Sequence, residues 1–483
     1  MAESSLKKNL NPMNVWAIAF GCIIGWGSFV NPGKKFLPNS GVAGTAIAML
    51  LGALVMVIIA VSYAYMVPKY PKAGGEFTFT KMCFGKTTAF FCGWFLVAAY
   101  LTNVPMNSTA IGLIVDGIDG SADILKFGFH YQIAGFDVWL GEIILATSIL
   151  LLFGFLNIIG VKKAGIIQTI LSVLLAVCAF TLCIAGLVSA KANSINMEPV
   201  WGFDKSTVTL ATVGDIEKYA HSGTAGVLSA ILATFAIAPW AFVGFDTIPQ
   251  VAEEFKFSYK KVLGIMVVAI AFGCFVYVSN NTVTAAALTN WPERVLAGEW
   301  VLLVAAEELL GVFGKVLVGT GVSCAVLSGI MGFYLASSRL MYSMGKDGYL
   351  PSIFGKVEKK YGTPKNAIIF CIIVSLSAPI LGREALGWFV DMSAIGASIG
   401  FMFTCISTLV TLKRDGDGSC ILKVMAIIGT VFSVSFMVLQ LIPIPGLPAV
   451  NFSNESYLML LVWVALGVVL FFSKRRAIKD GEI

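Results

Sequence analysis

The residues with the clearest chemical meaning lie in one apolar run, residues 223–249, which is long enough to cross a bilayer as a helix. Pro239 lacks a backbone N–H, Gly244 favours irregular backbone, and the acidic Asp246 follows at membrane depth. Because an unpaired backbone group is costly in lipid, unwound chain persists only inside protein or along a polar cavity. The run therefore predicts a discontinuous helix at a small-molecule site, and an ordinary proline kink is the alternative.

The first apolar run of the chain shows the same peculiarity. Gly21, Gly25 and Gly27 fall within seven residues, and the run closes on Pro32, so helical continuity is doubtful near Gly25 and Gly27. Close helix packing through Gly21 and Gly25 is the alternative. Two interrupted spans at matching positions, the first and the sixth, are the pattern typical of inverted-repeat secondary transporters.

Composition identifies the kind of molecule that must position these segments. The 483 residues are 58% hydrophobic and 12% charged, with a mean hydropathy of +0.87. Soluble domains carry about 25% charged residues, so this chain is an integral membrane protein of several helices. We do not interpret its net charge of +6 as a nucleic-acid patch. Its only histidines, His130 and His221, lie in polar connections, so we expect no metal site.

Twelve apolar runs have the composition of membrane spans. They cover residues 13–30, 41–67, 87–115, 138–159, 164–190, 223–248, 262–288, 312–344, 367–381, 385–412, 421–444 and 457–472. We therefore predict an all-α protein with 12 transmembrane helices. The sequence contains no CxxC pair or HExxH motif, so we expect neither an enzyme nor a cofactor.

The distribution of Lys and Arg predicts the orientation. Basic residues gather on alternate connections, and short cytoplasmic loops collect them, so both termini are predicted to be cytoplasmic. The predicted parts are a cytoplasmic N-terminus (1–12), a first five-helix repeat (13–190), a second inverted repeat (191–412), and the last two helices with a cytoplasmic C-terminus (413–483). Residues 291–311 are amphipathic and predict a short helix over the outer face.

Four motifs carry a family resemblance. They are YAYMVPKYPKAGGEFTFTKMCFG after the second span, GVKKAGIIQ opening the fifth, AFVGFDTIPQVAEEFK on the sixth, and ASSRLMYSMGKDGYLPSIFGKVEKKYGTPKNA ending the eighth. With the GxG pattern at Gly25 and Gly27, they resemble the amino acid–polyamine–organocation superfamily of permeases over residues 13–412. The resemblance implies the LeuT-like five-plus-five inverted repeat, with helices 1 and 6 broken around a central site and two C-terminal helices added.

The resemblance also implies how substrate is held. An ammonium group would meet free carbonyls of Ile23, Trp240 and Val243, and a carboxylate would meet the amides of Trp26 and Gly27. Helix termini carry partial charges of about half a unit, positive at the N-terminus and negative at the C-terminus, so paired breaks suit a zwitterion.

Two departures from the family pattern keep an alternative open. Family members mostly have Ser or Ala where this chain has Trp26, and an indole there offers its face to a cation. A substrate amine without a carboxylate is therefore the alternative. No lysine occurs between Lys163 and Lys191, so the lysine relay that some proton-coupled relatives carry on helix 5 is not expected.

Several other residues have a functional and a structural interpretation. Trp240 resembles the aromatic gate of relatives or is a packing residue, and Phe242 is evenly balanced between the same two. Asp246 either carries a proton or fixes the break by accepting from free amides. Asp391 is either an ion site or a solvated residue at a helix start.

The remaining candidates are polar side chains within spans. Asn103 and Asn107 either line the site or join helices, and Ser323 and Ser328 either coordinate sodium or bond to their own helix. Coupling to protons or to sodium is thus open at this point.

The leading hypothesis is a secondary active transporter that moves amino acids across the plasma membrane by alternating access. Its partners are a small amino acid or amine and the bilayer, with no nucleic acid. The nearest alternative is a transporter or exchanger of an organocation, and a membrane receptor or a channel is more distant.

Overall fold

The chain is a multi-pass helical membrane protein in a computed structural model that describes residues 6–119, 123–133, 136–205, 207–382, 385–444 and 451–479. Within these residues, ten helices are long and apolar enough to cross a membrane, and Pro12–Ile23 and Lys365–Leu381 are shorter apolar helices. All twelve predicted runs are therefore largely helical. Residues 1–5 and 480–483 of the predicted cytoplasmic termini lie outside the described residues.

The first part of the chain builds the elements around the first predicted break. They are α1 (Pro12–Ile23), α2 (Gly27–Asn31), the π-helix η1 (Pro32–Phe36), α3 (Leu37–Lys69), α4 (Gly75–Phe84), α5 (Lys86–Asp119), β1 (His130–Ile133), β2 (Phe136–Trp139), α6 (Leu140–Ile158) and α7 (Val161–Val188).

The second part begins with an irregular outer connection. It holds η2 (Ser194–Met197) and η3 (Val213–Lys218), followed by α8 (Gly223–Phe235), α9 (Ala238–Ala241), α10 (Thr247–Gln250), η4 (Ala252–Glu254), η5 (Tyr259–Lys261), α11 (Val262–Ala287), α12 (Trp291–Leu296), α13 (Val301–Leu310), α14 (Val312–Lys346), α15 (Lys365–Ser375), α16 (Ala378–Leu381), α17 (Ala385–Arg414), α18 (Cys420–Leu441) and α19 (Asn454–Lys479).

Two outer connections differ from the prediction. The strands β1 and β2 form an antiparallel hairpin with His130 opposite Trp139, although no strand was predicted. The amphipathic segment 291–311 forms two helices, α12 and α13, instead of one. Gly298 lies between them with φ +79°, a left-handed conformation that ends a helix at low cost to glycine.

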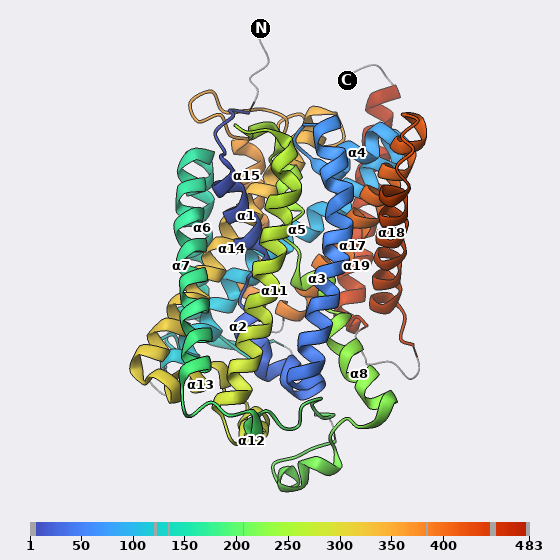
Figure 1. The fold of residues 1–483 in the computed structure, drawn as a ribbon. Helices are drawn as coiled ribbons and strands as arrows, with labels where there is room; N and C mark the ends of the chain where they lie inside the picture. Colours follow the sequence, from blue (N-terminus) through green and yellow to red (C-terminus); the bar gives the residue numbers. More distant parts are fainter. Residues whose placement is uncertain are drawn as a thin grey trace.

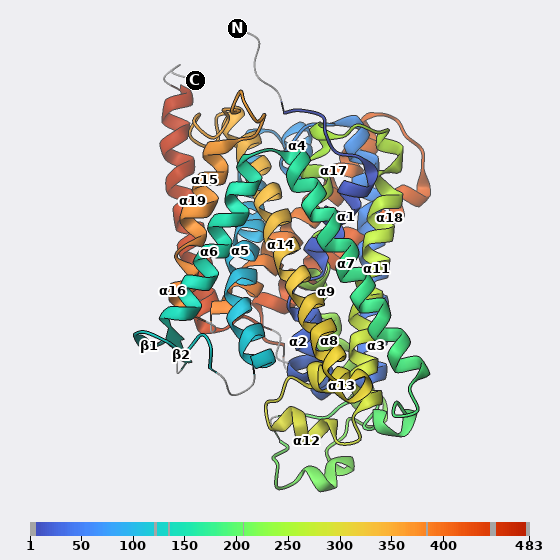
Figure 2. The same cartoon turned by 90° about the vertical axis from the view of Figure 1, so that its left-hand side faces the viewer.

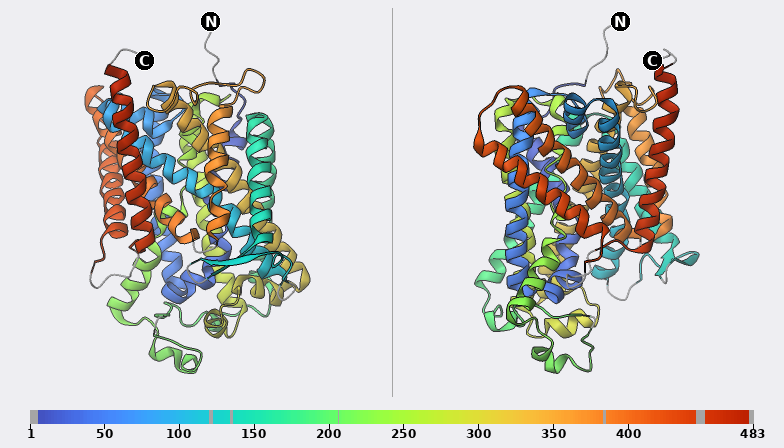
Figure 3. Two further views of the ribbon diagram at one scale, coloured as in Figure 1. Left: turned by 180° about the vertical axis from the view of Figure 1, so that it is seen from behind. Right: turned by 90° about the vertical axis from the view of Figure 1, so that its right-hand side faces the viewer.

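The helices are arranged around α5 and α14, which lie in the interior of the bundle (Figures 1 and 2). Of an 18-residue apolar stretch in α5, 83% of the residues are buried, whereas the share for such a stretch in α19 is 11%. Figure 3 shows α18 and α19 on the periphery, where their apolar surface would face lipid. The last two spans thus cover the outside of the bundle, where α19 packs on α5 with the rings of Trp94 and Trp463 stacked 4.4 Å apart.

Different helices lie at the two ends of the bundle. Helix α1 begins and α19 ends at one end, while α12 and α13 lie at the opposite end (Figures 1 and 2). The Trp300 indole N–H donates to the Phe29 carbonyl at 2.8 Å, so the connection before α13 is joined to α2. This contact fixes that connection against the first interrupted span.

Candidate functional site

The first break is a three-residue gap, residues 24–26. Helix α1 ends at Ile23, Ile24 adopts an extended conformation with φ −95° and ψ 101°, and helical structure resumes at Gly27. The sequence prediction of an interruption near Gly25 and Gly27 is confirmed. Glycine at position 25 leaves room for a side chain of another helix, because an added Cβ would lie 3.2 Å from Asn107 Oδ1.

The second break is the turn-rich segment of residues 242–246, between α9 and α10. Gly244 has φ +140°, a conformation that residues with a side chain rarely adopt. Pro239 lies in the first turn of the short helix α9, where its missing N–H is not needed. The sixth span is interrupted as predicted from Pro239 and Gly244: regular helix stops at residues 236–237, just before Pro239, and again at residues 242–246, around Gly244.

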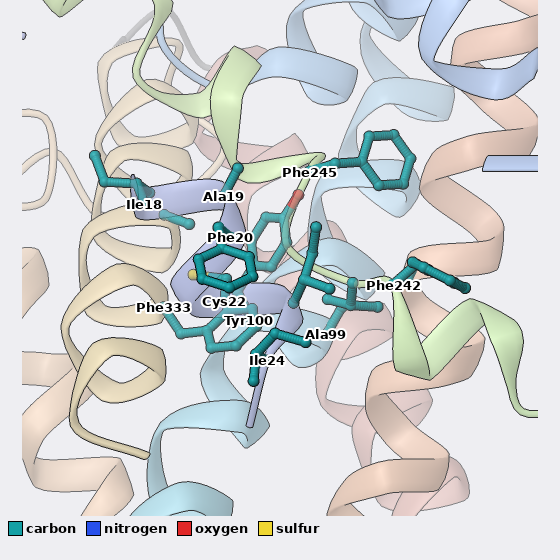
Figure 4. Close-up of a cluster of buried hydrophobic side chains, with 14 of the residues drawn as sticks. Ile18, Ala19, Phe20, Cys22, Ile24, Ala99, Tyr100, Phe242, Phe245 and Phe333 are labelled. Carbon is teal, nitrogen blue, oxygen red and sulfur yellow. The ribbon is translucent and has the colours of Figure 1, made fainter. Parts of the chain in front are cut away.

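The two breaks touch each other through their backbones. A Cβ added to Gly244 would lie 2.5 Å from the nitrogen of Ile23 and 2.8 Å from the carbonyl carbon of Cys22. Figure 4 shows Cys22 near the Tyr100 ring and Phe242 and Phe245 on the irregular chain of the second break. The peptide groups of both interrupted spans therefore come together at one point inside the protein.

Two tryptophans cover this meeting point. The rings of Trp26 and Trp240 lie 6.2 Å apart at 55°, and both residues are buried. A Cβ on Gly27 would lie 2.3 Å from Trp240 Cη2, so Trp240 packs directly on the start of α2. The Trp26 indole N–H is buried and has no acceptor within the described residues. It is an unused donor beside the first break.

An unused acceptor lies on the other side of the first break. Asn107 on α5 donates to the Asn103 carbonyl at 2.8 Å, while its own buried Oδ1 has no donor in the described part of the chain. Asn103 instead donates to the Ser393 hydroxyl at 2.6 Å and so joins α5 to α17. Of the two asparagines, Asn107 is the one that the structure brings to Gly25.

Two of the carbonyls that the resemblance implicates, those of Ile23 and Trp240, already accept hydrogen bonds within the protein. The Ile23 carbonyl accepts from the Tyr277 hydroxyl at 3.4 Å, and the Trp240 carbonyl accepts from the Val243 amide at 3.2 Å. The Tyr277 ring lies 6.2 Å from that of Phe242. These aromatic rings form an apolar wall next to the polar peptide groups.

The structure gives Asp246 two well-placed donors. The Gly244 amide donates to Asp246 Oδ1 at 2.7 Å, and the Tyr100 hydroxyl donates to Asp246 Oδ2 at 2.9 Å. This arrangement agrees with the structural interpretation, in which the carboxyl fixes the break, and it leaves the predicted proton role as a prediction.

The other predicted coupling residues are dispersed. The Ser328 hydroxyl donates to the Gly21 carbonyl at 3.2 Å and so reaches α1 from α14. Ser323 is half-buried one turn earlier on α14. Asp391 accepts from the Ser456 hydroxyl of α19 at 2.6 Å and makes no described contact with the breaks. A sodium site at the serines and an ion site at Asp391 stay predictions.

A buried ion pair joins the chain after α10 to α14. Glu254 accepts from Arg339 on α14 at 2.8 Å, and both side chains are fully buried. The backbone amides of Asn9 and Leu10 donate to the Glu254 carbonyl at 2.9 and 3.0 Å. The N-terminal segment is thereby attached to the chain that follows α10.

No group of three or more His, Cys, Asp or Glu side chains in the described residues is arranged to hold a metal ion. Near the first break the described residues instead leave one buried donor, Trp26 Nε1, and one buried acceptor, Asn107 Oδ1, without a partner.

Comparison with known proteins gives an independent identification. Residues 10–470 match the family model described as amino acid permease. The chain is 28% identical over 374 residues to the human large neutral amino acids transporter small subunit 2, covering 77% of this chain and 64% of that relative. It is 24% identical over 494 residues to a branched-chain amino acid permease of Bacillus subtilis, covering 97% and 93%. It is also 24% identical over 419 residues to cationic amino acid transporter 2, vacuolar, of Arabidopsis thaliana, covering 84% and 60%.

Proposed function

The chain belongs to the amino acid permease family of the amino acid–polyamine–organocation superfamily, and on this premise we propose that it is a secondary active transporter of amino acids. The proposal is carried by one observation: two interrupted spans meet backbone to backbone beside a buried donor, Trp26 Nε1, and a buried acceptor, Asn107 Oδ1, that the described protein leaves unused. Buried polar groups are rarely left unpaired, so a ligand that pairs both is favoured.

The proposed architecture is the LeuT-like five-plus-five repeat with 12 transmembrane helices, of which α1–α2 and α8–α10 are the interrupted pair. Breaks at matching positions five spans apart support it. Alternating access would then move one repeat against the other around the meeting point of the breaks. We assign the protein to the plasma membrane with both termini in the cytoplasm, because Lys and Arg favour the end at which α1 begins.

For the bound substrate, we assign the ammonium group to the carbonyl side and the carboxylate to the amide side of the first break. A substrate ammonium would replace the long bond at the Ile23 carbonyl, at 3.4 Å, and add a donor to the Trp240 carbonyl. The amides of Trp26 and Gly27 would receive the carboxylate, and Trp240 would close over it. Asn103 remains a candidate that acts indirectly, because its backbone carbonyl accepts a hydrogen bond from the Asn107 side chain.

The side chain of the substrate is proposed to be neutral and apolar. Phe242 and Tyr277 supply an aromatic wall, and both oxygens of the adjacent Asp246 already accept hydrogen bonds. An apolar side chain fits against this aromatic wall, whereas a charged side chain would lose its solvation there. Relatives named for large neutral and branched-chain amino acids agree with this choice, and one named for cationic amino acids does not.

The test is uptake of radiolabelled leucine, arginine and putrescine into proteoliposomes that contain the purified full-length chain. We expect saturable leucine uptake that unlabelled leucine competes away. Uptake of putrescine alone would favour the organocation alternative, and no uptake of any probe would overturn the proposal.

Replacement of Trp26 separates the two substrate classes further. The variant Trp26→Ser restores the small residue that is common in the family. If amino acids are the substrate, leucine uptake should be retained or its specificity broadened. If the Trp26 ring binds an organocation, putrescine binding should be lost.

A further inference from the structure

Five side chains next to the second break form a polar cluster that the proposed substrate site does not use. We call it the carboxylate cluster: Tyr63 on α3, Glu76 on α4, Tyr100 on α5, Asp246 at the start of α10 and Gln250 on α10. All five residues are fully buried. The cluster thus joins four elements of the bundle around two carboxyl groups.

Hydrogen bonds connect the two carboxyl groups through Tyr100. The Tyr63 hydroxyl donates to Glu76 Oε1 at 2.7 Å, and Gln250 Nε2 donates to Glu76 Oε2 at 2.5 Å. The Tyr100 hydroxyl donates to Asp246 Oδ2 at 2.9 Å, and its oxygen lies 3.4 Å from Glu76 Oε1. A proton could therefore pass between the carboxyls over a short bridge.

Neither carboxyl has a cationic partner among the described residues. The buried cation on α14, Arg339, pairs with Glu254, and Lys81 on α4 pairs with Asp347 at 2.7 Å. Two carboxylates without a counterion are strongly disfavoured in a low-dielectric interior, and close like charges raise the cost further. The arrangement therefore favours at most one ionised carboxyl at a time.

The other groups that face the cluster are neutral. Apart from the two tyrosines, they are Cys22 on α1, Cys92 on α5 and Thr404 on α17. None of these supplies a positive charge.

Gln250 provides a second, independent sign of an exchangeable proton. Its Nε2 contacts Glu76 and Tyr100, while its Oε1 is buried and has no donor within the described residues. A primary amide can serve both states of its neighbour: the N–H donates to a carboxylate, and after a half-turn the carbonyl accepts from a carboxylic acid. The donor that Oε1 lacks is the one a protonated Glu76 would provide.

We propose that Glu76 and Asp246 together hold one exchangeable proton, bridged by Tyr100, whose binding and release drive the transport cycle. This inference rests on the proposed transport function. The proton enters from the outer solution onto the carboxyl pair, crosses with the substrate, and leaves to the inner solution, so each cycle moves one positive charge more than the substrate carries.

Asp246 links this proton to the substrate site. Its Oδ1 accepts from the Gly244 amide, and Gly244 packs against the end of α1 at Ile23. When Asp246 is ionised it accepts from both Gly244 and Tyr100; when it is protonated, one of these bonds must change. A change there alters the contact between the two breaks.

The experiment uses the full-length chain in proteoliposomes that enclose a pH-sensitive dye. Leucine uptake is measured with the outside about two pH units more acidic and again in equal-pH exchange, and the ratio of the two is the readout. Such a gradient drives at most about a hundredfold accumulation per coupled proton. We expect the wild type to accumulate leucine with dye acidification, and Glu76→Gln and Asp246→Asn to lose the gradient-driven part of the ratio.

The matched control is Glu293→Gln, an exposed acid on α12. Its ratio should equal that of the wild type. Gradient-driven accumulation retained in Glu76→Gln, or accumulation in the wild type that follows sodium and not protons, would overturn the inference. Failure of the wild type to take up leucine, arginine and putrescine under every condition would instead overturn the proposed function.

A second variant covers the case in which Glu76→Gln fails to fold. Tyr63→Phe removes a donor that stabilises ionised Glu76, so the pH at which leucine uptake is half-maximal should move upward. An unchanged midpoint in a folded, active Tyr63→Phe protein would contradict the proton assignment.

Discussion

The two interrupted spans are broken in different ways. The first break spans only residues 24–26, contains no charged residue and leaves the Trp26 N–H unused. The second break spans residues 242–246, ends on Asp246 and is held by hydrogen bonds to Tyr100. This difference supports our proposals that a ligand pairs with the first break and that the charge on Asp246 acts on the second.

The largest effect on stability is expected at the ion pair between Arg339 and Glu254, which anchors the second interrupted span. Arg339→Leu leaves the Glu254 carboxyl buried without its cation, which should lower the free energy of unfolding by about 3–5 kcal/mol. Chemical denaturation of the purified protein in detergent measures it. Lys423→Gln, an exposed position on α18, is the control and should change little. Equal stability of Arg339→Leu and the wild type would show that the second break needs no anchor.

The next effect concerns the contact between the breaks. Gly244→Ala forces a strained φ and places a methyl group 2.5 Å from the Ile23 nitrogen, so stability should fall by about 2–4 kcal/mol and leucine uptake should be abolished. Thermal melting and uptake check this. Gly264→Ala on α11, where nothing lies within 4 Å, should leave both nearly unchanged. Normal leucine uptake by Gly244→Ala would show that transport does not depend on the contact between the two breaks.

A smaller effect is expected at the first break. The methyl group of Gly27→Ala would meet Trp240 Cη2 at 2.3 Å, and the far end of that ring can move, so the fold should survive with a loss of about 1–2 kcal/mol. Because Trp240 is proposed to close over substrate, the KM for leucine should rise. If stability falls as far as in Gly244→Ala, the two breaks are equally rigid and the comparison fails.

The smallest effect separates ligand binding from helix joining. Asn107→Ala removes the unused acceptor and should raise the KM for leucine about fivefold, because one buried hydrogen bond is worth about 1 kcal/mol. Asn103→Ala removes the bond to Ser393, so it should lower the melting temperature and leave the KM for leucine nearly unchanged. Uptake kinetics and melting curves of both variants test this. The reverse result would return Asn103 to the site in place of Asn107.

The spans and the first break could be predicted because they depend on the local composition of the sequence. Apolar length gives the helices, and clustered glycines beside Pro32 mark the unwound segment. The second break was predicted from Pro239 and Gly244 together. Proline is tolerated in the first turn of a short helix, so of the two it is Gly244, with its positive φ, that marks the unwound chain.

The carboxylate cluster could not be read from the chain because its members are distant in sequence. Glu76 follows two glycines in the PKAGGEF motif, where an acidic residue after a turn is ordinarily solvated. Only the packing of α4 against α5 and α10 buries it beside Gln250 and Asp246. The same reason explains why Arg339, in place of the nearby lysines, is the partner of Glu254.

The central claim is that the meeting point of the two breaks holds an amino acid. The most direct test is an experimental structure of the full-length protein determined with saturating leucine. The account predicts leucine density bounded by Ile23, Trp26 and Trp240, with Asn107 or the Trp26 indole paired to it. Continuous helices through residues 24–26 and 242–246, or leucine bound elsewhere with this point empty, would contradict it.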